Sequence, residues 1–143
     1  MFIGEYNYTI DPKGRISIPR LLRKSFLRGA VLTRGLDNCL FLFLEKDWKK
    51  IAEKIKSLPL GQSNSRAFAR LMLAGAMMVR LDSQGRILIP DYLRHYALLK
   101  KRIVLAGIYD RLEVWDKEEW EKYKAHTEKK SSDIAEKISD LGI

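Results

Sequence analysis

Two short stretches of the chain combine residue types that can bind a polyanion. The string Asp-x-x-Gly-Arg occurs at residues 11–15 and again at residues 82–86. Glycine permits the positive φ of a tight turn, and an aspartate at the start of a turn accepts hydrogen bonds from backbone N–H groups within it. The arginine then leaves the turn with a planar set of donors, which matches two phosphate oxygens or the O6 and N7 edge of guanine. An ion pair between aspartate and arginine inside the turn is the alternative role of the same residues.

The two loops differ in the charge around them. Gln84 and Asp91 in the second copy replace Lys13 and Arg20 in the first. The first half of the chain, residues 1–71, has 14 basic and 6 acidic residues, a net charge of +8, whereas the rest has 13 and 12, a net of +1. We therefore expect the first loop to make the stronger phosphate contacts and the second to contribute mainly geometry. The candidate DNA-contacting residues are Lys13, Gly14, Arg15, Arg20, Arg23, Lys24, Gln84, Gly85, Arg86 and Arg94, with Asp11 and Asp82 structuring the loops.

Both loops belong to a repeat that covers most of the chain. Residues 10–19 (IDPKGRISIP) recur as residues 81–90 (LDSQGRILIP), at an offset of 71 residues. After a slip of one residue the match continues to Trp48 and Trp120, at an offset of 72. A similarity of this extent predicts two units of the same fold in one chain.

Each copy predicts the same order of elements: strand, loop, strand, short helix, hairpin and closing helix. Isoleucine at alternate positions after each loop is the period-2 pattern of a half-buried strand. Pro19 and Pro90 end that strand and suit the first turn of a helix. Asp116, with Glu119 three residues later, predicts a capped start for the last closing helix. The expected strands are residues 6–10, 15–18, 30–34, 40–44, 77–81, 86–89, 102–106 and 112–115, and the expected short helices are residues 20–26 and 91–98.

Two further helices are predicted outside the repeated units. Residues 66–74 carry apolar side chains around most of their circumference, so this helix is expected to be buried between the copies or against another subunit. Ile134, Ile138 and Leu141 form an apolar stripe in a charged tail, which predicts a short amphipathic helix that docks on a neighbour. The expected division is a first repeat with its closing helix (1–58), a linker with the apolar helix (59–75), a second repeat with its closing helix (76–128) and the tail (129–143).

The overall charge also favours a polyanionic partner. The net charge is +9, and residues 113–143 hold six lysines and nine acidic residues, so residues 1–112 carry +12. Nucleic acid is the commonest partner of so basic a body. The sequence has neither an apolar run of about 18 residues nor a signal-peptide pattern, so we expect a cytoplasmic protein without a membrane helix. Cys39, the single cysteine, lies in an apolar run and is expected to be a buried, inert thiol.

The whole string around each loop is more specific than the loop alone. It reads as a strand followed by Asp-x-x-Gly-Arg-Ile-x-Ile-Pro-x-x-Leu-Arg. This string resembles the swapped-hairpin DNA-binding half of the AbrB-like superfamily, and its duplication resembles the MraZ family of bacterial transcriptional regulators. The opening residues 1–6, residues 81–86, and residues 113–116 with Trp120 and Tyr123 fit the same family.

The resemblance spans about residues 1–123 and implies both a fold and a function. The fold would be α+β and β-rich, with two tandem swapped-hairpin β-barrel-like units packed as a pseudo-dimer with flanking helices. The function would be sequence-specific binding of double-stranded DNA, with repression of the bacterial division and cell-wall gene cluster from a promoter with G-rich direct repeats. The implied partners are this DNA and further copies of the chain in an octamer-like ring, and the implied location is nucleoid-associated. The family's signature residues correspond to Asp11, Arg15, Asp82 and Arg86.

Three other functions compete with this one. An enzyme is disfavoured because His95 and His126 lie in no metal-ligand or triad-like spacing and no phosphate-binding or Cys-x-x-Cys motif is present. No cofactor, metal or small-molecule substrate is therefore expected. An AbrB-like antitoxin or transition-state regulator usually carries only one copy of the unit. A ring scaffold or RNA-binding protein without an operator is the third alternative, although residues 11–24 contain no aromatic side chain on which bases could stack.

Overall fold

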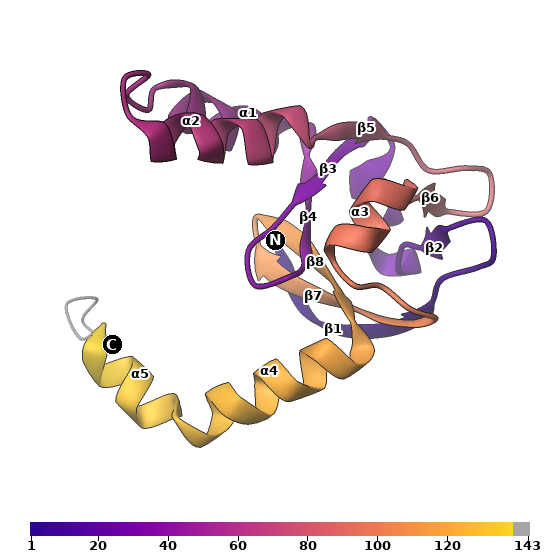
Figure 1. Cartoon of the computed structure of the whole chain (residues 1–143). Coiled ribbons are helices and arrows are strands. Elements are labelled where there is room, and N and C mark those ends of the chain that lie inside the picture. Colours follow the sequence, from indigo (N-terminus) through magenta and orange to yellow (C-terminus); the bar gives the residue numbers. More distant parts are fainter. Residues whose placement is uncertain (139–143) are drawn as a thin grey trace.

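The computed structural model describes residues 1–138, so Leu141 of the predicted tail stripe lies outside the described residues. The chain forms a mixed α+β fold with two antiparallel sheets (Figure 1). Its strands are β1 (Phe2–Thr9), β2 (Arg15–Ser17), β3 (Ala30–Arg34), β4 (Leu40–Leu44), β5 (Met77–Val79), β6 (Arg86–Leu88), β7 (Arg102–Tyr109) and β8 (Arg111–Asp116). Its helical segments are η1 (Arg20–Phe26), α1 (Glu45–Lys56), α2 (Ser63–Ala69), η2 (Arg70–Ala74), α3 (Asp91–Tyr96), α4 (Lys117–Lys129) and α5 (Ser131–Lys137).

The larger sheet interlocks the two repeats. Its strand order is β1-β7-β8-β4-β3-β5, and the smaller sheet is a ribbon of β2 and β6. Strand β1 of the first repeat pairs with β7 of the second, while β5 of the second repeat pairs with β3 of the first. The two hairpins, β3/β4 and β7/β8, meet through β4 and β8 at the centre. Each repeat therefore supplies an outer strand to the other, and the two repeats share one sheet.

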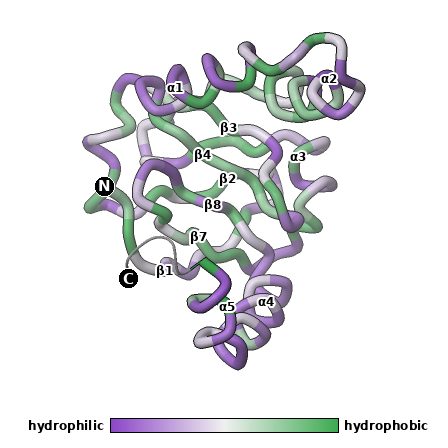
Figure 2. The backbone as a smooth tube through the Cα atoms, turned by 90° about the vertical axis from the view of Figure 1, so that its left-hand side faces the viewer, coloured by the Kyte–Doolittle hydropathy of each residue, from purple (hydrophilic) through white to green (hydrophobic). Residues whose placement is uncertain are grey.

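The main core lies between the six-stranded sheet and the ribbon. Strand β4 sends Leu40 and Leu42 into this core, because alternate residues of a strand point to opposite faces. Phe2 of β1 and Phe26 at the end of η1 stack at a ring-centroid distance of 5.7 Å and join the same core. Figure 2 shows the hydrophobic strands at the centre of the molecule and the more hydrophilic α4 and α5 at its periphery. The ribbon contributes four isoleucines that are almost fully buried: Ile16, Ile18, Ile87 and Ile89.

The predicted elements are confirmed, with changes at their ends. Strand β1 begins at Phe2, four residues earlier than expected, because it pairs with β7 along its whole length. Helix α3 ends at Tyr96 rather than at residue 98, since Leu98 adopts a positive φ of 56° that a helix does not accommodate. Asp116 caps α4 as predicted, because its side chain accepts hydrogen bonds from the backbone N–H groups of Glu118 and Glu119, at 3.2 and 3.4 Å.

The apolar helix between the repeats differs from the prediction. It begins at Ser63, three residues earlier than expected, and its last turn widens into the π-helical segment η2. It does not lie between the two repeats, since α2 packs beside α1 and η2 contacts β3. Met72 is its buried residue, whereas Leu73 is exposed. Because α1 and β3 cover only part of its apolar surface, burial against another subunit, the other predicted alternative, stays a prediction.

The C-terminal part of the described chain extends away from the sheet. Helices α4 and α5 run outward from β8, and α1 with α2 projects in the same general direction from the other side of the sheet (Figure 1). Ile134 and Ile138 of the predicted tail stripe are exposed. Within residues 1–138, none of the helices combines the length and apolar composition needed to cross a membrane.

Candidate nucleic-acid interface

The first Asp-x-x-Gly-Arg loop is a turn organised by its aspartate. The Oδ1 atom of Asp11 accepts hydrogen bonds from the backbone N–H groups of Lys13 and Arg15, at 3.0 and 2.8 Å. Its Oδ2 atom accepts from Nε of Arg15 at 2.7 Å. Gly14, with φ of 86°, donates its N–H to the backbone carbonyl of Asp11 at 2.9 Å. The loop therefore requires glycine for its conformation and aspartate for its hydrogen bonds.

The second loop repeats this geometry. Asp82 accepts from the backbone N–H groups of Gln84 and Arg86 at 2.8 and 2.9 Å, and from Nε of Arg86 at 2.8 Å. Gly85 has φ of 76° and donates to the carbonyl of Asp82 at 3.0 Å. Replacement of Lys13 by Gln84 does not alter the turn, because this position contributes only its backbone N–H.

The hydrogen bonds of the loops lower the pKa of both aspartates. For Asp11 the backbone N–H of Arg15 has the largest effect, desolvation opposes it, and the side chain of Arg15 lowers the pKa further. Arg86 lowers the pKa of Asp82 in the same way. Each turn contains an ion pair between its aspartate and its arginine.

This ion pair leaves part of each arginine available. The carboxylate occupies Nε of Arg15, and within residues 1–138 neither terminal nitrogen of this side chain has a hydrogen-bond or ion-pair partner. Nη1 of Arg86 lies 3.9 Å from Oδ2 of Asp11, at the limit of an ion pair. The side chains of Arg15 and Arg86 are 29% and 24% exposed. Each aspartate thus orients an arginine without consuming all its donors.

The ribbon joins the two loops, one at each of its ends, and brings Arg15 and Arg86 close together. Ile16 of β2 lies opposite Ile87 of β6, and these two residues occupy the same position in the two repeats. The ribbon therefore has a local two-fold arrangement, with Arg15 and Arg86 on either side of its axis. They are diagonal neighbours on the antiparallel pair, so their backbones lie about 7–8 Å apart.

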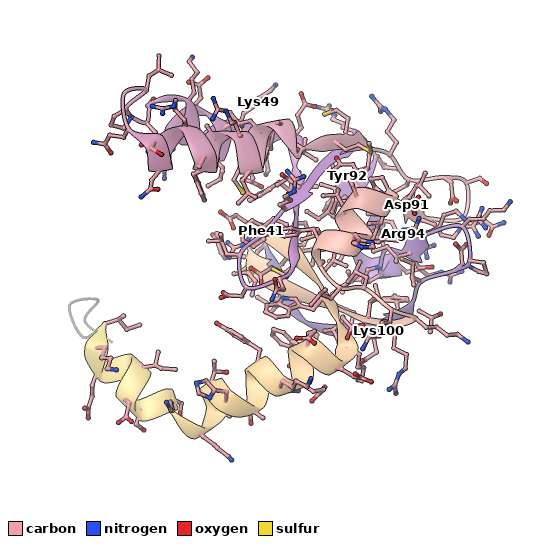
Figure 3. The ribbon with its side chains drawn as sticks, viewed as in Figure 1. Phe41, Lys49, Asp91, Tyr92, Arg94 and Lys100 are labelled. Atoms are coloured by element: carbon pink, nitrogen blue, oxygen red, sulfur yellow. The ribbon has the colours of Figure 1, made fainter. Side chains whose placement is uncertain are left out.

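The remaining predicted residues fall into two groups. Lys13 and Gln84 in the loops and Arg20 and Lys24 on η1 are exposed. Arg23 and Arg94 are instead partly buried, and each lies against a glycine of a loop. Figure 3 shows Arg94 beside Asp91, to which its Nη2 atom is ion-paired.

Sequence reasoning missed one residue of this surface. Leu88 is 53% exposed and pairs with Arg15 across the ribbon, where the first repeat has Ser17. The signal was present, because inward-facing Ile87 and Ile89 place the residue between them on the outer face. An apolar side chain beside the arginines can contact the methyl group of thymine.

Other chemistry receives no support from the described part of the chain. Residues 1–138 contain no cluster of three or more His, Cys, Asp or Glu that could hold a metal ion. Cys39 is fully buried, as expected, and its Sγ donates to the carbonyl of Leu36 at 3.1 Å. Burial raises the pKa of this thiol far above its ordinary value, and the charge of Glu113 adds to the effect.

Comparison with known proteins explains the duplicated loop. The family model of the MraZ protein, described as antitoxin-like, matches residues 1–71 and again residues 72–141. The chain belongs to the MraZ family. Membership confirms the resemblance drawn from the loop string, and the family is one of transcriptional regulators rather than enzymes. Each match contains one Asp-x-x-Gly-Arg loop, so the internal repeat is a tandem pair of family units.

Relatives match over the whole chain. Proteins named transcriptional regulator MraZ from Thermoanaerobacter sp. (strain X514), Caldanaerobacter subterraneus subsp. tengcongensis and Alkaliphilus oremlandii are each 46% identical over 143 residues. The alignment covers 100% of this chain and 100% of each relative.

Proposed function

We propose that the chain is a sequence-specific DNA-binding transcriptional regulator that contacts double-stranded DNA through a two-loop platform. The platform consists of residues 11–15 and 82–86 together with the β2/β6 ribbon. The observation that carries the proposal is that two turns of the same geometry flank one short ribbon, each with an arginine oriented by its own aspartate. The full-length relatives named as transcriptional regulators support the same function.

The platform geometry suits a short base-paired element. A guanidinium whose Nε is held by a carboxylate still has terminal N–H groups that can donate to O6 and N7 of guanine. The backbone separation of Arg15 and Arg86, about 7–8 Å, equals roughly two base-pair steps of 3.4 Å. Both arginines could therefore contact bases of one short G-rich element. Lys13 of the first loop would contact phosphates, as would Arg20 and Lys24 of η1, the segment whose Arg23 packs on the second loop.

The fold supports a finer assignment. The exchange of β1 and β5 between the repeats is what a pair of swapped-hairpin units would produce. We therefore assign the body to two swapped-hairpin, barrel-like units of the AbrB type, packed as a pseudo-dimer. By the family resemblance, the target is a promoter of the bacterial division and cell-wall gene cluster with G-rich direct repeats, the effect is repression, and the protein is cytoplasmic and nucleoid-associated.

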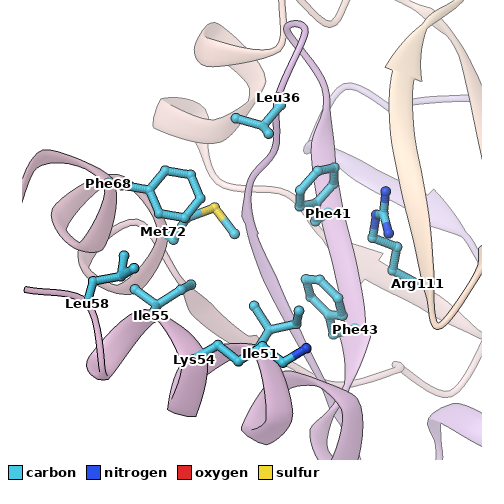
Figure 4. Close-up of a pocket in the computed structure, with 10 residues that line it drawn as sticks. All are labelled: Leu36, Phe41, Phe43, Ile51, Lys54, Ile55, Leu58, Phe68, Met72 and Arg111. Carbon is cyan, nitrogen blue, oxygen red and sulfur yellow. The ribbon is translucent and has the colours of Figure 1, made fainter. Parts of the chain in front are cut away.

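The sheet face away from the ribbon suits assembly with further copies. A groove of about 350 Å³ opens there between the sheet, α1, α2 and η2 (Figure 4). Copies arranged as a ring would present one platform per subunit to repeated DNA elements, and the linkage would raise affinity through effective concentration. The exposed Ile134 and Ile138 of the tail would extend the interface. The groove is lined mainly by apolar residues, among them Phe41, Phe43, Ile51, Ile55, Phe68 and Met72.

The DNA proposal is tested by replacing each platform arginine. Arg15→Ala and Arg86→Ala should each weaken binding to a repeat-containing duplex by about 5- to 150-fold, the worth of one bidentate base contact. Lys49→Ala is the matched control, because Lys49 is an exposed basic residue of α1 outside the platform. Binding is measured at fixed salt against scrambled duplexes, and then across a salt series.

Two outcomes of these measurements would remove the proposal. One is that neither arginine variant weakens specific binding while both remain folded. The other is an affinity nearly independent of salt, since phosphate contacts by a body this basic must release counterions. Selection of bound duplexes from a random pool supplies the operator, and no enrichment would favour the scaffold or RNA-binding alternative.

Assembly is tested separately by mass in solution. Phe68→Asp places a charge in the apolar groove and should reduce the size of the oligomer, as should truncation after Lys130 if the tail takes part. Leu60→Asp is the control, because Leu60 is an 82% exposed residue outside the groove lining. An unchanged mass for both Phe68→Asp and the truncated chain would exclude this surface from the assembly.

A further inference from the structure

Each loop glycine is covered by an arginine from the other repeat. A Cβ atom on Gly85, in the second repeat, would overlap the Nε and Cζ atoms of Arg23, from the first. A Cβ atom on Gly14, in the first repeat, would lie 2.6 Å from Nη1 of Arg94, from the second. Arg23 and Arg94 are equivalent positions, 71 residues apart, and are called the crossed arginines below. The two glycines are therefore needed for their positive φ, and any side chain at either position would have to displace the guanidinium that covers it.

The backbone connects the loops in the same crossed sense. The N–H of Ile18 donates to the carbonyl of Gly85 at 2.9 Å, and Nε of Arg23 donates to the carbonyl of Ile18 at 2.8 Å. Gly85 is thus bonded to Ile18 of the first repeat and is also covered by the guanidinium of Arg23, which is itself bonded to Ile18. The N–H of Ile89 donates to the carbonyl of Gly14 at 2.8 Å in the reciprocal position.

The two halves of this arrangement are unequal. Nε of Arg94 is buried and has no hydrogen-bond partner in the described chain, whereas Nε of Arg23 is bonded. The outer nitrogen Nη2 of Arg94 is ion-paired with Asp91, which stands where the first repeat has Arg20. The carboxylate therefore holds the outer end of Arg94 in the second repeat. Arg23 packs on the second loop and is fixed by its hydrogen bond to Ile18 of its own repeat, whereas Arg94 packs on the first loop and is fixed by its ion pair with Asp91.

We propose that the crossed arginines are positioning residues for the opposite loop and do not themselves contact DNA. Arg23 belongs to the same repeat as Arg15 and lies eight residues after it, yet it packs on the second loop and so positions Arg86. Arg94, from the second repeat, positions Arg15 in the same way. This inference rests on the proposed DNA-binding function. It replaces the sequence-based expectation that Arg23 and Arg94 bind DNA directly, because their guanidinium groups lie on the loop backbone.

The alternative role of Arg23 is a phosphate contact, and three variants separate the two roles. Arg23→Gln removes the fixed guanidinium, Arg23→Lys keeps the charge without the planar group, and Lys24→Gln is the matched control at the exposed neighbouring position. If Arg23 positions the second loop, both Arg23 variants lose affinity for the repeat duplex by up to the loss of Arg86→Ala, about 5- to 150-fold. The slope of log affinity against log salt then stays that of the unmodified protein. Lys24→Gln weakens repeat and scrambled duplexes alike and reduces the slope by about 0.9.

A double-mutant cycle tests the crossed sense directly. Arg23→Gln combined with Arg86→Ala should be no worse than the more severe single variant, because both act on the second loop. Arg23→Gln combined with Arg15→Ala should show the product of the two single effects. A general loss of stability would act equally in both pairs, so it cannot produce this difference. Arg94→Gln should show the reverse pattern, and it replaces Arg23→Gln if that variant does not fold.

The outcomes distinguish this inference from the function on which it rests. If Arg15→Ala and Arg86→Ala leave specific binding intact, the DNA-binding proposal fails. If they weaken binding, the function stands and the Arg23 variants decide the positioning role. That role fails if the effect of Arg23→Gln multiplies with those of both Arg15→Ala and Arg86→Ala, or if Arg23→Lys binds as the unmodified protein does. It also fails if Arg23→Gln lowers the slope of log affinity against log salt by about 0.9. Same-loop coupling, with Arg23→Gln non-additive only with Arg15→Ala, would also overturn it.

Discussion

Replacing Gly85 by alanine perturbs the second loop at the point where the two repeats touch. Its φ of 76° is unfavourable for an L-residue, at a cost of about 1–2 kcal/mol. The added Cβ would also displace the guanidinium of Arg23 and break its 2.8 Å hydrogen bond to the carbonyl of Ile18, worth about 0.5–1.5 kcal/mol. The free energy of unfolding should therefore fall by about 1.5–3.5 kcal/mol.

Two other glycines separate these contributions. Gly4 has φ of 96°, but a Cβ there meets only the ring of Tyr6 at 3.6–3.7 Å, which is ordinary contact. Gly4→Ala should therefore cost only the conformational part, about 1–2 kcal/mol. Gly61 has no positive φ and no neighbour within 4 Å, so Gly61→Ala should change stability by less than about 0.5 kcal/mol.

The assay is urea unfolding at one protein concentration, because assembly would make stability depend on concentration. Tryptophan fluorescence follows the transition, since Trp115 is buried beneath α4. A Gly85→Ala protein as stable as the Gly4→Ala protein would show that the contact with Arg23 contributes nothing. A Gly85→Ala protein as stable as the Gly61→Ala protein would refute the conformational argument as well.

Three further predictions concern titratable groups. The pKa values of Asp11 and Asp82 are lowered in the folded state. At pH values above about 3.9, the ordinary Asp pKa, the two carboxylates therefore stabilise the loops fully, and this effect is lost only as the pH falls through the lowered pKa values. Midpoints at or above about 3.9 in a carboxyl ¹³C NMR titration would contradict this prediction. Cys39, buried with a raised pKa, should react with a thiol reagent only after unfolding, and equal rates in folded and denatured protein would disprove its burial. Trp120→Phe removes the N–H that donates to Glu5 at 2.8 Å, so the pKa of Glu5 should rise towards its ordinary value, and an unchanged titration would exclude this hydrogen bond.

The candidate site was predictable where its bonds are local. All the hydrogen bonds of Asp11 and Asp82 reach residues at most four positions away, so the string Asp-x-x-Gly-Arg contains the whole turn. The cap at Asp116 is local in the same way and was predicted correctly. The sequence left two alternatives for the apolar helix, because an apolar circumference indicates burial without indicating which surface covers it. The exposed Leu88 was overlooked although the alternation of the strand placed it on the outer face.

The turn and the periodicity of the strands follow from residues near one another in the chain, and the duplication can be read by comparing its two halves. The pairing of β1 with β7, of β5 with β3, and of β2 with β6 in one ribbon is known from the three-dimensional arrangement alone. Two similar repeats carry the same period-2 pattern, so pairing within a repeat and pairing between repeats satisfy that pattern equally well. The crossed contacts of Arg23 with Gly85 and of Arg94 with Gly14 follow from the pairing between repeats. The structure thus turns two separate basic loops into a single platform.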